Sequence, residues 1–302
     1  MPHSNADPVI KNNDTVLRGP QKVMTGQGSQ PPALMGIVNV TPDSFSDGGR
    51  YVTTQAAIDH GLALADAGAS ILDIGGESTR PGAVPVEREQ ELARVLPVID
   101  GLAGKTDAKI SIDTRNAHIA VRAIEAGATI WNDVSALSHD DASIEHAARL
   151  GCEIVLMHAQ GDPRTMQDDP CYEDVVTEVI AYLAGRIELC CAAGIERANL
   201  IVDPGIGFGK TLEHNLALMR DLARFDALGC RVLLGASRKR FIGALDREGP
   251  AHDRLGGSIA AAIFAAWRNV AILRVHDVAQ TRQALQVAAA IQPDFNKLSP
   301  SS

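Results

Sequence analysis

The strongest constraint on the fold is an alternation of two kinds of segment that runs along most of the chain. From Leu34 onward, short apolar runs rich in β-branched residues alternate with amphipathic segments of helical periodicity. Many of the latter end in glycine, as at Gly68, Gly127 and Gly151, where glycine can end a helix in the left-handed conformation. Strands are expected at residues 34–40, 71–74, 109–112, 130–133, 153–157, 200–203, 232–234 and 270–274. Helices are expected to begin near Thr54, Glu87, Ala117, Ala142, Tyr172, Glu213, Gly256 and Val278.

Eight strand–helix units of similar size, with no antiparallel signal, favour an α/β fold of the closed (β/α)8 TIM-barrel type over an open doubly wound sheet. A chain of 302 residues suits such a barrel as a single domain, expected over residues 31–293. Residues 1–30 are polar and aperiodic and are expected to be a flexible extension, with a short strand or plug at Val16 and Leu17 as one option. Residues 294–302 are expected to form a disordered tail.

The composition of the chain indicates which kinds of ligand it binds and in which compartment it is expected. The formal net charge is −9, so the chain is a poor candidate for sequence-independent binding of nucleic acid. No apolar run reaches the length of a membrane span, and the N-terminus lacks the apolar core of a secretion signal. The five cysteines have no metal or redox spacing and are read as small buried residues in a reducing compartment. These features predict a cytoplasmic protein that acts on small molecules.

The first expected strand is followed by a loop that is rich in polar groups. Asn39 interrupts the end of an apolar run, and residues 41–49 then contain two carboxylates, three hydroxyls and one aromatic ring. Side chains at the carboxyl end of a barrel strand are where chemistry is expected. One such loop is equally explained by helix capping, but the pattern recurs at the other strand ends.

The polar residues at the strand ends fall into two chemical sets. Asp113, Asn132 and Asp203 are short hydrogen-bonding groups that suit a flat heterocycle with an amino-amide edge. The second set offers donors and positive charge for a phosphate or diphosphate: Thr79, Arg80, Ser237, Lys239, Arg274 and His276. Helix capping does not explain the cations, so a ligand that carries both chemical parts is expected.

Two further sequence features resemble functional motifs but are better explained by structural roles. Residues 205–211 resemble the end of a phosphate-binding P-loop, but Pro204 stands where its first glycine is required. That segment is interpreted as a tight strand-to-helix loop from which Lys210 is free to reach the barrel mouth. His158 stands at a strand end, where a histidine is more often a hydrogen-bonded structural group than a base.

Taken together, these motifs resemble those of the dihydropteroate synthases, the folate-pathway enzymes targeted by sulfonamides. The matching segments are residues 35–49, 73–82, 111–114, 131–134, 156–161, 203–210, 235–239 and 274–278. They occur in order over almost the whole expected barrel, and the set is specific although no single piece is. Ala159 stands where methionine is expected, and Arg240 where serine is common. The first difference is expected to reshape the pterin pocket slightly.

The resemblance implies that dihydropterin-CH2-diphosphate and p-aminobenzoate condense to dihydropteroate and pyrophosphate. It implies a pterin site of Asp113, Asn132, Asp203 and Lys239. It implies a diphosphate site of Asn39, Thr79, Arg80, Arg274 and His276, with Mg²⁺ held by Asn39 and Asp47. It places p-aminobenzoate near Phe45, Thr79, Pro81 and Ser237, and it assigns catalysis to Asp113, Lys239, Arg274 and His276.

Three alternatives remain open on the sequence. A methyltetrahydrofolate-type methyltransferase domain uses a similar pterin pocket, but it has no use for the cations that follow the last two expected strands. A non-catalytic pterin-binding paralogue would keep the pocket and lose turnover. A general phosphate-binding barrel such as an aldolase is the third. The alanine-rich apolar faces of residues 259–267 and 284–291 are explained by core packing or by a homodimer interface, which the resemblance favours.

Overall fold

The computed structural model describes residues 31–40, 50–77, 86–161 and 165–291. The expected N-terminal extension, with Val16 and Leu17, and the expected C-terminal tail lie outside these ranges. None of the helices within them is long and apolar enough to cross a membrane.

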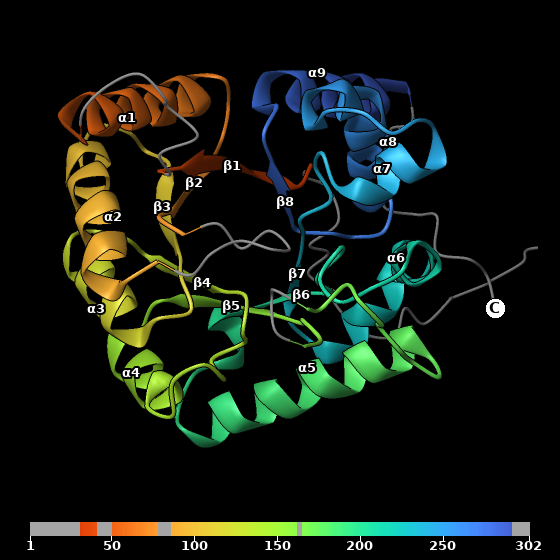
Figure 1. Ribbon diagram of the computed structural model, residues 1–302, viewed down its shortest axis with the longest axis horizontal. Helices are drawn as coiled ribbons and strands as arrows, with labels where there is room; N and C mark the ends of the chain where they lie inside the picture. The colour runs from red at the N-terminus through yellow and green to blue at the C-terminus, as the bar shows by residue number, and fades with distance from the viewer. Residues whose placement is uncertain (1–30, 41–49, 78–85, 162–164, 292–302) are drawn as a thin grey trace, which may run out of the picture.

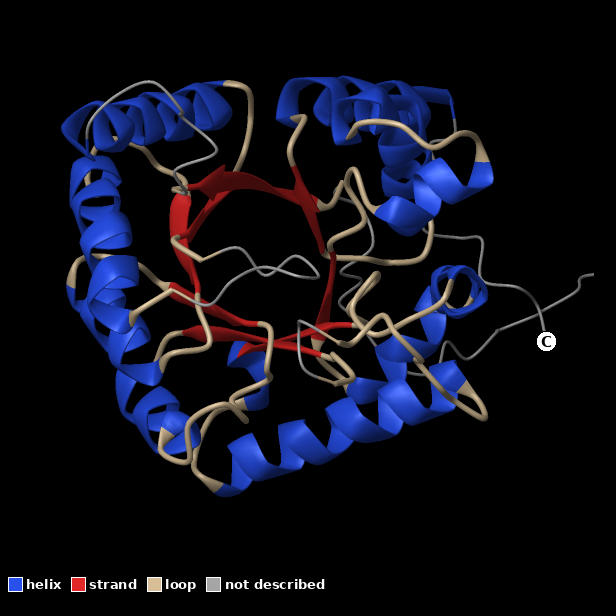
Figure 2. Cartoon of the chain, viewed as in Figure 1, coloured by secondary structure: helices blue, strands red, loops and turns tan. Residues whose placement is uncertain are grey.

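Eight parallel strands form a closed barrel in which each strand pairs with the next and β8 pairs with β1. The strands are β1 Ala33–Asn39, β2 Ile71–Gly75, β3 Lys109–Asp113, β4 Ile130–Asp133, β5 Glu153–Met157, β6 Leu200–Asp203, β7 Arg231–Leu234 and β8 Ile272–Val275. Figure 2 shows these strands as a ring with the helices outside it. The predicted (β/α)8 barrel is confirmed.

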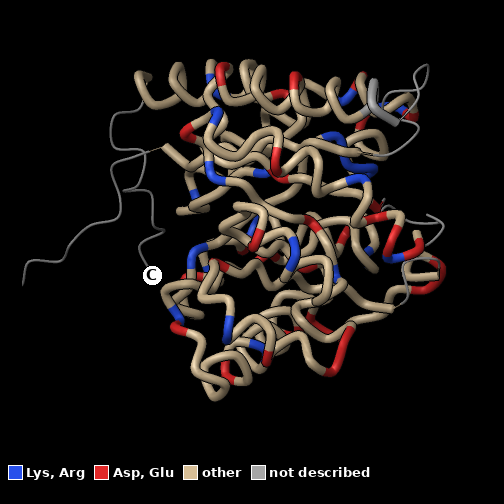
Figure 3. Tube along the Cα trace, turned by 90° about the vertical axis from the view of Figure 1, so that its left-hand side faces the viewer, with Lys and Arg blue, Asp and Glu red and all other residues tan. Residues whose placement is uncertain are grey.

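The helices follow the strands in the expected order (Figure 1). They are α1 Arg50–Asp66, α2 Arg88–Leu102, α3 Ala117–Glu125, α4 Ser143–Leu150, α5 Val175–Ala192, α6 Leu212–Arg220, α7 Arg240–Leu245, α8 Leu255–Ala266 and α9 Val278–Ile291. The described part of the chain also contains the short 3-10 helices η2 Arg197–Asn199, η3 Leu222–Leu228 and η4 Ala251–Arg254. Figure 3 shows acidic and basic positions interspersed along the visible side of the trace.

Some element boundaries differ from the sequence prediction for local physical reasons. Helix α5 begins at Val175 rather than near Tyr172, because the Asp174 side chain accepts hydrogen bonds from two backbone N–H groups of the first turn. Strand β8 begins two residues later than expected, after Asn269 has turned the chain with a positive φ of 60°. The six-residue helix α7 was not expected, because one and a half turns are too short for a detectable period.

The barrel interior has an apolar floor built from one side chain of almost every strand. This cluster consists of Met35, Ile71, Ile130, Val155, Ile201, Leu233 and Ile272. Successive side chains of a strand point to opposite faces, so the residue two positions later returns to the interior. A larger aliphatic cluster fills the space between the barrel and its helices. The floor therefore determines which residues line the next layer towards the carboxyl end.

Candidate active site

Polar side chains occupy the layer directly above the apolar floor. Counting two residues on from the floor gives the polar residues Asp73, Asn132, Asp203 and Arg274 on β2, β4, β6 and β8, the apolar residues Ile37 and Met157 on β1 and β5, and Gly235 directly after β7. The three acidic or amide side chains among them are almost fully buried. Regular strand alternation thus brings together, at one end of the barrel, polar groups that are far apart in the sequence.

The guanidinium of Arg274 joins two carboxylates inside the barrel. Its Nε lies 2.6 Å from Asp73 Oδ2, and its Nη2 lies 2.7 Å from Asp113 Oδ2. Burial alone would disfavour the charged guanidinium, but the two carboxylates hold the pKa of Arg274 above its ordinary value. Arg274 therefore lies among the groups predicted to bind the heterocycle, while its predicted contact with a diphosphate is not tested.

Asp73 organises this layer, although the sequence pattern indicated no role for it. It is fully buried and accepts hydrogen bonds from Ser111 Oγ at 2.6 Å and from Arg274. Asn132 Nδ2 also lies 3.3 Å and 3.2 Å from its two carboxylate oxygens. Asp73 thus orients one side chain from each of strands β3, β4 and β8. The sequence signal was a carboxylate inside the apolar run of β2, two residues after a floor residue.

Asp113 has a carboxylate oxygen that is available to a ligand. Its Oδ1 is buried and has no hydrogen-bond partner within the described ranges. The pKa of Asp113 is raised to about 7, because the effect of burial, to which the nearby Asp73 carboxylate adds, outweighs the opposing charge of Arg274. Two carboxylates share one guanidinium here, so the second is only partly compensated. A buried acceptor without a donor is costly unless a ligand supplies one.

Asn39 lies beside Asp113 at the end of β1. A Cβ placed on Gly75 would lie 3.6 Å from the Asp113 Cβ and 3.8 Å from Asn39 Oδ1, so the two side chains flank this glycine. The carbonyl oxygen of Asn39 is a suitable ligand for a hard cation such as Mg²⁺. Asn39 therefore stands where it was predicted, at the mouth and next to the carboxylate layer.

Asp203 and Lys239 complete the opposite side of the layer. Asp203 Oδ1 accepts a 2.7 Å hydrogen bond from the backbone N–H of Gly205, and burial raises the pKa of this carboxyl. Burial lowers the pKa of Lys239 to about 8, against the opposing charge of Asp203. The Lys239 ammonium donates to the Ile206 carbonyl and lies 4.3 Å from the centroid of the Phe208 ring. An ammonium over a ring and a buried carboxylate together form one wall of a polar pocket.

Ser237 and His276 meet at the ends of β7 and β8. Ser237 Oγ lies 3.0 Å from His276 Nδ1, and it also accepts a hydrogen bond from the His276 backbone N–H at 3.2 Å. The sequence placed both residues in the site but did not predict that they touch. Their contact adds hydroxyl and imidazole groups to the cationic side of the mouth.

Lys210 is not free to reach the mouth as predicted. Its side chain is buried, and its Nζ lies 2.9 Å from His158 Nδ1 and 2.9 Å from the Phe208 carbonyl. Burial lowers the pKa of Lys210 to about 7, and burial also lowers the pKa of His158 to about 3. A Cβ on Gly205, whose φ is +70°, would lie 1.8 Å from the His158 carbonyl, so these two loops touch through their backbones. The structural interpretation of His158 is supported, because its ring serves this loop contact.

Some predicted site residues lie outside the described ranges. They are Phe45, Asp47, Thr79, Arg80 and Pro81. Their roles remain predictions from the sequence. Among the predicted residues that the structure describes, Asn39, Asp113, Asn132, Asp203, Ser237, Lys239, Arg274 and His276 all follow or end barrel strands at the same mouth.

Comparisons with known proteins agree with this geometry. The sequence model of the family described as "Pterin binding enzyme" matches residues 35–276. The dihydropteroate synthase of Escherichia coli strain K12 is 46% identical over 259 residues, which cover 86% of this chain and 91% of that protein.

Solved structures extend the likeness to three dimensions. A Xanthomonas albilineans dihydropteroate synthase with 4-aminobenzoic acid matches with a TM-score of 0.82 and 48% identity, over 87% of this chain and 93% of that one. The same organism's enzyme in complex with 7,8-dihydropteroate matches with a TM-score of 0.79 and 45% identity, over 87% and 94% of the two chains. The chain therefore belongs to the pterin-binding enzymes, within the dihydropteroate synthase family, and is a transferase.

Proposed function

We propose that the barrel mouth binds a dihydropterin-CH2-diphosphate and joins its methylene carbon to the amine of p-aminobenzoate, with release of pyrophosphate. The observation that carries this assignment is the buried Oδ1 of Asp113, which lacks a donor within the described ranges. It lies in the same layer as Asn132 and Asp203, so the layer offers acceptors to the amino-amide edge of a flat heterocycle.

The pterin site follows from the chemistry of this layer. The carboxylates of Asp113 and Asp203 accept hydrogen bonds from ring N–H and amino groups, and the Lys239 ammonium donates to ring acceptors. Asp73 accepts hydrogen bonds from Nδ2 of Asn132, so the carbonyl oxygen of Asn132 is proposed to accept from the ligand. The solved relative with 7,8-dihydropteroate supports a pterin-containing ligand for this chain.

The leaving diphosphate suits the cationic side of the mouth. Ser237 and His276 offer donors at the ends of β7 and β8, and Thr79 and Arg80 are proposed to add theirs. The residues present also fit Mg²⁺, because Asn39 supplies a carbonyl oxygen and Asp47 a proposed carboxylate. The described ranges contain no cluster of three or more His, Cys, Asp or Glu side chains able to hold a metal ion. A bound Mg²⁺ would supply positive charge that offsets the negative charge of the diphosphate.

The residues support bond breaking from both sides of the reacting carbon. As the C–O bond to the diphosphate breaks, positive charge develops on the methylene carbon and the pterin ring, next to the carboxylates of Asp113 and Asp203. The electron pair leaves on the diphosphate oxygen, where His276 and the proposed Arg80 can stabilise it. The amine nitrogen of p-aminobenzoate then forms the C–N bond and loses a proton. Because an aromatic amine is already a competent nucleophile, the site needs no strong base.

The direct test is release of pyrophosphate by the purified protein with Mg²⁺ and dihydropterin-CH2-diphosphate, with and without p-aminobenzoate. The expected result is release that depends on p-aminobenzoate and yields dihydropteroate in equal amount. Binding of the pterin substrate without any release would contradict the proposal and indicate a non-catalytic paralogue. Pyrophosphate without dihydropteroate would reject the condensation step.

Pterin binding is expected to be strongest between about pH 7 and pH 8. Asp113, with its pKa raised to about 7, is a carboxylate acceptor above that pH and loses this form below it. Lys239, with its pKa lowered to about 8, is an ammonium donor below that pH and loses its proton above it. Calorimetric titration from pH 5.5 to 9 checks this, with an expected loss of about tenfold in affinity per pH unit on each side.

Two variants test which residue causes the loss of pterin affinity at each end of the pH range. Asparagine at position 113 does not titrate, so Asp113→Asn should remove the loss of pterin affinity at low pH. Lys239→Arg should move the loss of pterin affinity at high pH to values above pH 9. A loss of affinity at low pH that persists unchanged in Asp113→Asn would show that another group is responsible.

The apolar faces of α8 and α9, over residues 259–267 and 284–291, are proposed to form a homodimer interface. A cavity of about 590 Å³ lies among α6, α7, η4 and α8 and is lined in part by Phe241, Leu245 and Phe264. Leu245 beside this cavity and Val287 on α9 are 58% and 54% exposed, so both have apolar surface available to a partner. Sedimentation of the protein as a monomer at micromolar concentration would reject this interface. The cytoplasmic location predicted from the sequence remains a prediction.

A further inference from the structure

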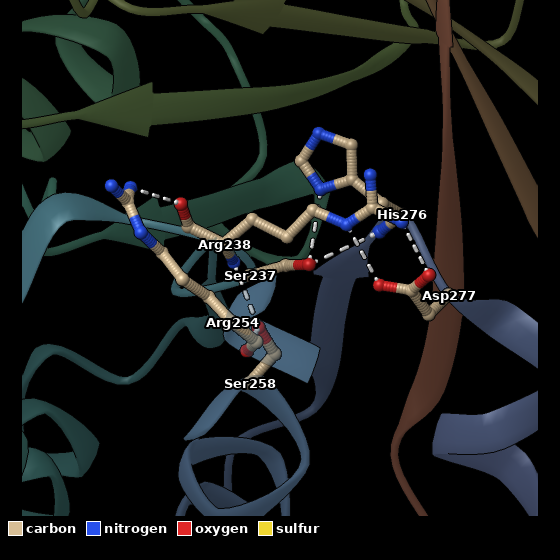
Figure 4. Close-up of polar contacts among 6 residues, drawn as sticks. All are labelled: Ser237, Arg238, Arg254, Ser258, His276 and Asp277. Carbon is tan, nitrogen blue, oxygen red and sulfur yellow. Dashed lines mark hydrogen bonds and ion pairs between the residues drawn. The ribbon is translucent and has the colours of Figure 1, made fainter. Parts of the chain in front are cut away.

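Two adjacent pairs of side chains join the connection after β7 to the connection after β8. Ser237 contacts His276, and the next residue on each segment repeats the pairing, because Arg238 contacts Asp277. Arg238 Nε lies 2.9 Å from Asp277 Oδ2, and its Nη2 lies 2.5 Å from Oδ1. Figure 4 shows the Arg238 side chain running alongside Ser237 and His276 to reach Asp277. The two pairs therefore form a double contact between the segments.

The backbone of Arg238 has an uncommon conformation that its neighbours hold in place. Its φ is +58°, in the left-handed region that residues other than glycine seldom adopt. Its N–H donates to Ser258 Oγ at 2.9 Å, and its carbonyl accepts from Arg254 Nη1 at 3.0 Å (Figure 4). Arg254 also donates to the Gly249 carbonyl at 2.9 Å. Backbone strain held by several independent contacts is typical of functional loops.

This turn sends the side chains on either side of Arg238 to different parts of the site. Ser237 faces His276 at the end of β8, whereas the Lys239 ammonium lies over Phe208 beside the β6 strand end. The turn thus separates two nearby residues that were predicted to contact different ligand groups.

The Arg238 guanidinium is already occupied by protein groups. Two of its nitrogens bind both oxygens of Asp277, and the side chains of Arg238 and Asp277 are 29% and 15% exposed. Such a two-pronged pair fixes direction as well as distance. Because Asp277 directly follows His276 and precedes the first residue of α9, the pair also ties His276 to a helix end.

We propose that Arg238 and Asp277 are positioning residues that hold Ser237 and His276 in register for the attack of p-aminobenzoate and the departure of the diphosphate. This inference rests on the proposed function of the mouth. Neither side chain is assigned a contact with substrate, and both act through their neighbours. The side chains of Asp113, Asn132 and Asp203 have no contact with this pair within the described ranges, so binding of the pterin ring without its diphosphate should depend little on it.

The first test uses Asp277→Asn, which keeps the shape and the capping ability of the side chain but removes its charge. The expected result is a rise of about tenfold in KM for p-aminobenzoate and a similar fall in kcat, because small displacements of positioned groups cost about this much or more. The dissociation constant for a dihydropterin that lacks the diphosphate, measured by calorimetry, should stay within about twofold of the wild-type value. An unchanged KM and kcat would overturn the proposal.

Arg238→Gly separates the pair from the backbone turn. Glycine adopts the positive φ readily, so the turn is retained while the contact with Asp277 is lost. The same rise in KM and fall in kcat as in Asp277→Asn is expected, and the double variant should be no worse than either single one. Wild-type kinetics in Arg238→Gly would show that the turn alone matters, and would reject the role of the pair.

Glu153→Gln is the control, because Glu153 at the start of β5 forms ion pairs with Lys109 and Arg231 at the other end of the barrel from Arg238. Arg231 at the start of β7 lies 2.7 Å from Glu153, with similar partial exposure. If loss of an ion pair merely loosens the barrel, this control should change KM and kcat as much as Asp277→Asn does, which would overturn the proposal. The expected control has wild-type KM and kcat. A wild-type protein that makes no dihydropteroate would refute the proposed function instead, so the two failures are distinguishable.

Discussion

Arg274→Ala is expected to lower the free energy of unfolding by about 3–5 kcal/mol, the usual effect of removing one partner of a buried ion pair. The side chain is 21% exposed, and it contacts Asp73, which is fully buried, and Asp113. Its removal leaves two carboxylates close together without a cation, so both are destabilised by burial and by each other. Turnover should also fall by about 10²–10³-fold, because the carboxylate layer loses the group that holds it in order.

Urea unfolding and initial rates of dihydropteroate formation measure the two effects. Arg274→Lys should recover part of the stability but little of the turnover, because an ammonium cannot form the same two-pronged bridge. Arg231→Ala, at the outer end of β7, breaks the 2.7 Å ion pair with Glu153 and should leave turnover near the wild-type value. If Arg274→Ala has the wild-type free energy of unfolding and only KM is raised, the contacts of Arg274 with Asp73 and Asp113 contribute little to stability or turnover, and this interpretation is wrong.

Asp203→Ala is expected to weaken binding of the pterin substrate by about 10²-fold, which corresponds to a charge-assisted hydrogen bond worth about 2–3 kcal/mol. The carboxylate is buried in the layer above the floor, and its partial neutralisation by Lys239 leaves it ready to accept from ring N–H groups. The variant also removes the acceptor for the Gly205 N–H, so the loop after β6 should lose some order.

Calorimetry with dihydropterin-CH2-diphosphate checks this result, and Asp203→Asn is its control. Asparagine can still accept from Gly205 and should preserve the loop, but it has lost the charge and one acceptor. We expect Asp203→Asn to bind the pterin almost as weakly as the alanine variant while it unfolds like the wild type. Normal binding by both variants would remove Asp203 from the pterin site.

The barrel and the ends of its strands followed from local pattern alone. Each expected strand is a short apolar run that ends in a polar residue, as the run at residues 200–203 ends in Asp203. Closing a parallel barrel then brings all carboxyl ends to one mouth, whatever the separation along the chain. For this reason the sequence by itself predicts that Asp113, Asn132, Asp203, Lys239 and Arg274 gather at the mouth, where the barrel places them.

The partners of these side chains depended on the closed tertiary structure. Arg274 joins Asp73 and Asp113 across the barrel interior, and Lys210 turns to His158 instead of the mouth. Arg238 adopts a left-handed conformation because neighbours from η4 and α8 hold it there. A sequence pattern predicts which strand end a residue occupies, but it does not predict which side chain that residue contacts. Those contacts depend on burial, because a charged group that is removed from water is costly unless a nearby group of opposite charge or a hydrogen-bond partner compensates it. They involve residues up to 201 positions apart, so no local window contains them.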